Sequence, residues 1–210
     1  MRLRFLAATL GMAVAAAPLQ AQVVPAGTFG SLPANSFTGN GIPTDAVMLG
    51  GGNGSTIGLS VTQRYTSPGL SNDGAGTWWA APGNSSGGPS NIGFATWNFD
   101  YYVREGTASP TDFFTLYVDL NPVTGNALNT LNAYSFGSNA AGSTNLHYFS
   151  AGFDNTQSGE YSFALYQYDA NGNAIDHVAV NVNVTPEPAS LMLLGTGLFG
   201  IGAFARRRRA

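Results

Sequence analysis

Hydrophobic and polar residues alternate in three runs along the middle of the chain, over residues 57–65, 97–104 and 178–184. Successive side chains of a β-strand point to opposite faces, so each run predicts a strand with one buried and one wetted face. Strands of this kind are typical of antiparallel sheets that pack on a single core.

Residues 112–120 depart from this alternation, because apolar side chains occupy both phases of the run, namely Phe113, Phe114, Leu116, Tyr117 and Val118. Apolar residues in both phases of a strand indicate that the strand is buried on both faces of its sheet. We therefore expect this strand to be central and covered on both sides.

Turn-forming residues separate the runs, and the clearest turn lies at residues 169–173, Asp-Ala-Asn-Gly-Asn, between runs at 161–168 and 175–184. Asn-Gly between two alternating runs predicts a β-hairpin, because both residues tolerate positive φ. We predict an all-β fold, an antiparallel β-sandwich of about seven to nine strands. Residues 22–55, rich in Gly, Pro, Ser, Asn and Thr, are expected to be an irregular lead-in with one or two short strands.

The N-terminal residues have the features of a secretory signal peptide. Arg2 and Arg4 precede an apolar stretch over residues 5–17, and Ala21 provides the small residue that signal peptidase needs. The alternative is an uncleaved anchor, but about thirteen apolar residues are too few to span a bilayer. We expect a signal peptide at residues 1–21 and an ectodomain at residues 22–185.

The C-terminal residues predict a membrane segment. Pro186, Glu187 and Pro188 should be extended, because proline fixes φ and removes a backbone donor. Residues 189–205 are apolar and, as a helix, would span roughly 25 Å, slightly less than a hydrocarbon core of about 30 Å. The basic tail that follows consists of Arg206, Arg207, Arg208 and Arg209. By the positive-inside rule it stays cytoplasmic, so we predict a single C-terminal transmembrane helix with the ectodomain outside.

Residues 184–190 read Val-Thr-Pro-Glu-Pro-Ala-Ser, and Leu-Met-Leu-Leu-Gly-Thr-Gly-Leu-Phe-Gly follows before the arginines. This order resembles the PEP-CTERM sorting signal of exosortase substrates in Gram-negative bacteria, a module also named the ice-binding protein C-terminal domain. The resemblance covers residues 185–210. It implies recognition by an exosortase, which is a multi-pass membrane cysteine transpeptidase, and removal of the helix near Pro-Glu-Pro. It also implies inner-membrane anchoring before processing and delivery to the cell surface or an exopolysaccharide matrix afterwards. The alternative is an ordinary membrane anchor after a proline-rich linker.

Removal of both ends changes the charge balance. The ectodomain keeps Arg64 and Arg104 against ten acidic residues, a net charge of −8, and the chain contains no lysine. Such a surface repels nucleic-acid phosphates and anionic lipid, so we expect no nucleic-acid partner. The chain has no cysteine, which excludes a disulfide framework, a thiolate metal site and a cysteine nucleophile.

Two local patterns resemble functional motifs without their context. Residues 83–87, Gly-Asn-Ser-Ser-Gly, match a hydrolase nucleophile elbow, but neither a core strand before them nor a helix after them is predicted. We interpret them as a Gly/Ser loop. His147 and His177 are the two candidate bases, but they have no spacing typical of a metal site.

Asp169, Asn171 and Asn173 resemble the opening of a calcium loop, but its sixth and twelfth positions would be Ala174 and Val180 instead of glycine and an acid. We favour the hairpin turn. Weak calcium binding between loops stays open, and the acidic residues nearest in sequence are Asp100, Glu105, Asp112 and Asp119. The last two flank one strand, lie seven residues apart and should face opposite ways, which disfavours a hydrolytic pair. We predict no catalytic residue, cofactor or metal.

Trp78 and Trp79 lie beside a Gly/Ser/Pro loop at residues 82–90 and could stack on sugar rings. We favour a core role, in which one ring plugs the end of the sandwich and the other covers it. The sequence therefore predicts an exported, non-enzymatic surface or matrix protein that can associate with exopolysaccharide. The alternatives are a secreted carbohydrate-binding module and a glycan-active enzyme that uses two ectodomain carboxylates.

Overall fold

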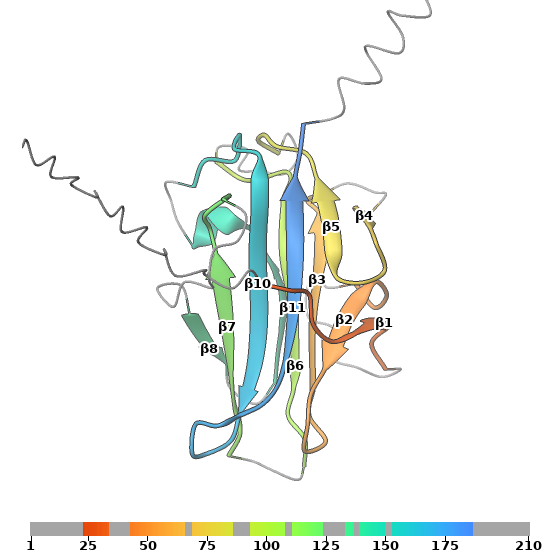
Figure 1. The fold of residues 1–210 in the computed structure, drawn as a ribbon, viewed down its shortest axis with the longest axis vertical. Helices are drawn as coiled ribbons and strands as arrows, with labels where there is room; N and C mark the ends of the chain where they lie inside the picture. Colours follow the sequence, from red (N-terminus) through yellow and green to blue (C-terminus); the bar gives the residue numbers. More distant parts are fainter. Residues whose placement is uncertain are drawn as a thin grey trace, which may run out of the picture.

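The computed structural model describes residues 23–33, 43–65, 69–85, 93–107, 111–123, 133–136, 139–149 and 153–186. These residues form a five-stranded and a six-stranded β-sheet, with a single 3-10 turn as their helical element (Figure 1). The predicted all-β class is confirmed. The signal peptide expected at residues 1–21, the helix expected at 189–205 and the basic tail lie outside the described residues. Within the described residues, no helix is long and apolar enough to cross a membrane.

The five-stranded sheet contains, in spatial order, β1 (Thr28–Gly30), β2 (Val47–Gly50), β3 (Thr56–Gln63), β6 (Trp97–Arg104) and β9 (Asn139–Thr144). All neighbouring strands in this sheet are antiparallel. The alternating runs at residues 57–65 and 97–104 form β3 and β6, which pair from Thr56 and Arg104 to Gln63 and Trp97. The lead-in, expected to carry one or two short strands, contains β1 and β2.

The six-stranded sheet contains, in spatial order, β4 (Ser71–Asn72), β5 (Thr77–Ala80), β11 (Ala174–Val184), β10 (Gly159–Tyr168), β7 (Phe113–Asp119) and β8 (Ala133–Phe136). The predicted hairpin is β10–β11, and the Asp169 carboxylate closes its turn by accepting from the Asn171 and Asn173 amides at 2.9 and 2.8 Å. The sheet is mixed, because β5 and β11 run parallel. The 3-10 turn η2 (Leu146–Tyr148) follows β9.

The described residues form eleven strands, more than the seven to nine expected. The shortest additional ones, β1 and β4, have three and two residues. So short a strand shows no measurable period in the sequence and exists because a longer neighbour supplies its hydrogen-bond partners.

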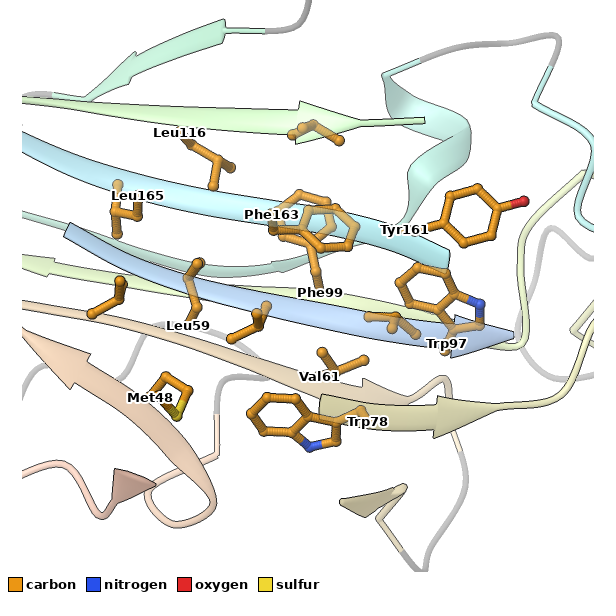
Figure 2. Packing of buried hydrophobic residues seen from close by; sticks show 14 of the residues in the cluster. Met48, Leu59, Val61, Trp78, Trp97, Phe99, Leu116, Tyr161, Phe163 and Leu165 are labelled. Atoms are coloured by element: carbon orange, nitrogen blue, oxygen red, sulfur yellow. The ribbon is translucent and has the colours of Figure 1, made fainter. Parts of the chain in front are cut away.

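The core lies between the two sheets and is built largely from aromatic and branched side chains (Figure 2). Phe99 of β6 stacks on Phe163 of β10 with ring centroids 4.6 Å apart, and Trp97 meets Phe163 edge-on at 6.0 Å. Each such side chain contributes about 1.5–3 kcal/mol when fully buried. Because the rings come from both sheets, these contacts hold the two sheets face to face.

The strand predicted at residues 112–120 is β7, and part of that prediction is wrong. β7 is the second strand from the edge, between β10 and β8. Phe114, Leu116 and Val118 fill the core, whereas Phe113 on the other face is 40% exposed and Tyr117 is half-buried. These two rings pack sideways against rings of β10 on the same face, and Phe113 stays partly open to solvent.

A short N-terminal segment lies against the six-stranded sheet and partly covers it (Figure 1). Asn181 of β11 donates its side-chain amide to the Val23 carbonyl at 3.0 Å. Ala26 and Ala179 exchange two backbone hydrogen bonds of 3.0 Å each. The first described residues after the expected signal peptide are therefore bound to the strand that ends at the C-terminal tail.

Candidate functional site

The C-terminal tail begins where β11 ends. Val184 pairs with Gly159 of β10 on one side and with Ala80 of β5 on the other. The Thr185 amide donates to the Ala80 carbonyl at 3.0 Å, and Pro186 follows directly. The first residue of the predicted tripeptide therefore lies two positions beyond a strand that is paired on both sides. Glu187, Pro188 and the four arginines lie outside the described residues.

At this same end of the sandwich, an arginine lies between aromatic rings. The end cluster consists of Arg64, Tyr65, Phe94, His147 and Tyr148. The Arg64 guanidinium lies 4.1 Å from the centroid of Phe94 and 4.5 Å from that of Tyr65. Phe94 also contacts His147 and Tyr148, with ring centroids 4.9 and 5.4 Å apart. Arg64 and Phe94 are buried, whereas Tyr65 and Tyr148 are 62% and 68% exposed.

Hydrogen bonds from Asn145 fix η2 and its rings on the start of β6. The Asn145 carboxamide oxygen accepts from the Ala95 amide at 3.0 Å, and its nitrogen donates to the Trp97 carbonyl at 2.8 Å. Tyr65 follows β3 with a positive φ of 56°. A bulky side chain in the left-handed region costs of order 1–2 kcal/mol, so the surrounding contacts hold Tyr65 in a strained conformation.

Two further bonds connect the end cluster to the point where the tail begins. The Arg64 amide donates to the Thr96 carbonyl at 2.8 Å, and the Thr96 hydroxyl donates to the Ala81 carbonyl at 2.6 Å. Ala81 follows Ala80, whose carbonyl holds Thr185. Figure 1 shows η2 toward the end of the sandwich from which the chain leaves β11.

A second group of rings, the aromatic row, lies on the outer face of the six-stranded sheet. Its members are Phe113 and Tyr117 of β7, Tyr166 and Tyr168 of β10, and His177 of β11. Parallel stacking joins Phe113 to Tyr168 at 5.1 Å, Tyr168 to Tyr166 at 5.8 Å and Tyr166 to His177 at 4.8 Å.

Tyr117 completes the aromatic row. Its ring meets that of Tyr166 edge-on, with centroids 5.5 Å apart, and its hydroxyl lies 3.0 Å from that of Tyr168. Partial burial and the hydrogen bond with the Tyr117 hydroxyl raise the pKa of Tyr168, so its phenol is a neutral hydrogen-bonding group near pH 7. The row offers polarisable ring edges together with uncharged hydroxyls.

The structure separates the two tryptophans suggested for sugar stacking. Trp78 is 1% exposed and packs against Phe29 with centroids 6.0 Å apart, whereas Trp79 is 39% exposed. Neighbouring residues of a strand point to opposite faces, so Trp78 belongs to the core and Trp79 lies on the outer face. The two rings cannot hold one ligand together.

The polar residues that the sequence offered as candidate catalytic groups or metal ligands make hydrogen bonds or ring contacts within the fold. Asp112 accepts from the Gln167 side chain at 2.7 Å at the opposite end of β7 from Asp119. The described part of residues 83–87 is hydrogen-bonded to the chain beyond it, since the Ser85 amide donates to the Phe94 carbonyl at 2.9 Å. His147 and His177 belong to the end cluster and to the aromatic row, respectively. The described residues contain no group of three or more His, Cys, Asp or Glu side chains that could hold a metal ion.

Neither aromatic group was identified from the sequence. A local signal for the row existed, since Tyr166 and Tyr168, like Phe113 and Tyr117, occupy the outward phase of their strands. The end cluster gave no such signal, because its rings come from segments far apart in the sequence, after β3, before β6 and after β9.

Fold and tail together define a class, that of exported all-β domains joined to a C-terminal sorting signal. A family model described as the PEP-CTERM protein-sorting motif matches residues 184–209. The chain therefore carries this motif, which confirms the resemblance, and it is an exported protein with a membrane-anchored C-terminal signal for exosortase-mediated sorting. A comparison with curated proteins found no match.

Proposed function

We propose that this protein is a non-enzymatic component of the cell surface or extracellular matrix, released from its membrane anchor by processing near Pro186, Glu187 and Pro188. The observation that carries the proposal is the match of the sorting motif to residues 184–209, which begins at the last residue of β11. The exported unit that reaches the surface is therefore the folded sandwich itself.

The hydrogen bonds that the candidate carboxylates make within the fold support a non-enzymatic role. Asp169 accepts from two backbone amides of its own turn, and Asp112 is bonded to Gln167. Asp112 and Asp119 are about 23 Å apart along the strand direction of β7, at roughly 3.3 Å per residue, whereas a hydrolytic carboxylate pair needs a separation of about 5–10 Å.

Replacement of Pro186, Glu187 and Pro188 by alanine tests the sorting step. The variant should stay in the inner membrane, because the tripeptide read by the exosortase is lost while the apolar segment remains. Cell fractionation measures the distribution, and mass spectrometry of the wild-type protein locates its C-terminus. Arg104→Ala, an exposed change in the ectodomain, is the control and should sort normally. An unchanged distribution of the triple variant would contradict the proposal.

A second proposed function is association with a neutral exopolysaccharide through the aromatic row. Aromatic surface contacts the apolar faces of sugar rings, and tyrosine hydroxyls can bond to sugar hydroxyls. The acidic ectodomain, with a net charge of −8, favours a neutral over an anionic polymer.

Affinity electrophoresis in gels that contain a neutral polysaccharide tests this association. The double variant Tyr166→Ala and Tyr168→Ala should lose most of its retardation, whereas Tyr148→Ala, an exposed ring outside the row, should keep it. Equal retardation of both variants would exclude the row, and a loss on Trp79→Ala alone would assign the binding to Trp79. Release of reducing ends during incubation would instead favour the glycan-active enzyme.

A further inference from the structure

The distance that the tail allows between the folded domain and the membrane is short. Four peptide steps separate Thr185 from Ala189, where the predicted membrane segment begins. A fully extended chain covers at most about 14 Å over four residues. The polar headgroup layer on one side of a bilayer is itself roughly 5–8 Å thick. While the tail is intact, the end of the sandwich that carries Thr185 must therefore lie at the membrane surface.

The most exposed rings of the described residues lie at this end. Tyr148 and Tyr65 are 68% and 62% exposed, whereas the next rings, Phe113 and Trp79, are 40% and 39% exposed. Hydrogen bonds through Thr96 and Ala81 place Tyr65 beside the residues that hold Thr185. Tyrosine is enriched where membrane meets water, because its ring is apolar and its hydroxyl is polar.

Charged side chains are distributed unevenly at this end of the sandwich. Their distribution favours membrane contact through the side formed by the five-stranded sheet. Tyr65, Tyr148 and the Arg64 guanidinium follow β3 and β9 of the five-stranded sheet. Among the described residues, the acidic side chains at this end are Asp119 of β7, Asp154 of the turn before β10 and Glu160 of β10. Contact through the five-stranded side brings the two exposed tyrosine rings toward the headgroups and keeps these three acidic side chains away from them.

We propose that, before processing, this end of the sandwich rests on the bilayer through Tyr65 and Tyr148, tilted toward the five-stranded sheet. The partner is the headgroup region of a phospholipid membrane. This inference rests on the proposed membrane anchoring by residues 189–205. It adds a defined orientation, in which the hydroxyl and ring of Tyr148 lie among the headgroups and the far end of β7, with Phe113, points away from the membrane.

Because the chain has no cysteine, a single introduced cysteine reports on one position. Tyr148→Cys, Val123→Cys and Phe113→Cys are each labelled with an environment-sensitive fluorophore in the chain that retains its tail. The proteins are reconstituted into phosphatidylcholine vesicles in which some lipids carry a nitroxide in the headgroup region. Val123 is 62% exposed and follows β7 at the same end as the tail, which makes it the test of the tilt, and Phe113 is the control at the far end.

The label at position 148 should be quenched severalfold more than the label at 113, with position 123 between them. Equal quenching at 148 and 113 would overturn the inference, and stronger quenching at 123 than at 148 would overturn the tilt. Flotation of the vesicles tests the proposed membrane anchoring separately from the orientation of the domain. A chain that does not float with vesicles contradicts membrane anchoring, whereas a chain that floats without quenching at 148 contradicts the orientation alone. Near-ultraviolet circular dichroism confirms that each variant is folded.

Discussion

Asp100 shows how a single residue departs from the pattern around it. It lies on β6 in the outward phase of the alternation, where the sequence predicts a wetted side chain, yet it is fully buried. The Thr62 hydroxyl donates to its carboxylate at 3.2 Å. Burial is the largest effect and raises the pKa of Asp100 to about 8, against hydroxyls of Ser143 and Thr62 that lower it. The carboxyl group is therefore mostly protonated in the folded protein at neutral pH.

The pKa of Asp100 predicts a pH dependence of stability. The folded-state pKa, about 8, lies above the ordinary value of 3.8, so the folded state binds this proton more strongly than the unfolded state does. The stabilisation is complete below pH 4 and is lost as the pH rises toward 8, with a slope of up to about 1.4 kcal/mol per pH unit. Asp100→Asn should flatten this slope, as measured by urea denaturation at a series of pH values between the ordinary pKa of 3.8 and the folded-state pKa of about 8.

Asp45→Asn makes the same substitution on an exposed side chain and is the control for Asp100→Asn. Its denaturation curves should follow those of the wild type at each pH. If Asp100→Asn keeps the wild-type slope, the carboxyl group is ionised in the folded protein and the burial argument is wrong.

At the scale of the element, β11 connects the parts of the molecule. It pairs along its length with β10, runs parallel to β5 and binds the N-terminal segment through Ala179 and Asn181. The buried Asn181 side chain also accepts from the Ser162 hydroxyl at 2.9 Å. One strand therefore holds both the first described residues of the chain and the start of the sorting motif.

Asn181→Ala should destabilise the fold and release the N-terminal segment. It removes the acceptor for Ser162 and the donor to Val23, which leaves buried polar groups unpaired at a cost of about 1–3 kcal/mol. Urea denaturation measures the loss, and hydrogen exchange at the Ala26 and Ala179 amides should accelerate. Asn183→Ala, two residues further along the same face and half-buried, should change stability by less than about 1 kcal/mol. Equal effects of the two changes would show that the Val23 contact contributes nothing.

At the scale of the whole molecule, the folded domain and the sorting signal meet without a spacer. The last core residue, Val184, is also the first residue that the sorting motif matches. In the processing proposed above, a membrane enzyme that cuts near Pro-Glu-Pro would work within a few residues of a paired strand. The end of the folded domain and the enzyme would then share the same membrane surface.

A chain that ends after Thr185 should fold as a cooperative unit, whereas a chain that ends after Val180 should not. The longer chain keeps every core residue of β11, while the shorter one loses Val182 and Val184 and the pairing with β5. Two buried valines alone account for about 3–6 kcal/mol, a large share of the stability of a typical domain. Thermal unfolding followed by circular dichroism distinguishes the two chains. A cooperative transition in the shorter chain would show that β11 is dispensable beyond Val180.

The sequence by itself determined what local pattern can encode. The alternation of apolar and polar residues predicted the long strands β3, β6 and β11, and Asn-Gly predicted the β10–β11 hairpin. The order of tripeptide, apolar run and arginines predicted the sorting tail. These features depend on residues close together in the chain, so their patterns can be recognised before the fold is known. The shortest strands carried too few residues to show a period.

Only the tertiary structure decided which surfaces are covered. The same alternating pattern places Asp100 in a closed environment, leaves the row of Phe113 and Tyr166 uncovered, and sends Trp78 inward and Trp79 outward. It also gathers Arg64, Phe94 and Tyr148 beside the start of the tail. The physical reason is that a strand's period sets which side chains share a face, whereas cover over that face comes from segments distant in sequence, whose positions depend on the packing of the whole chain.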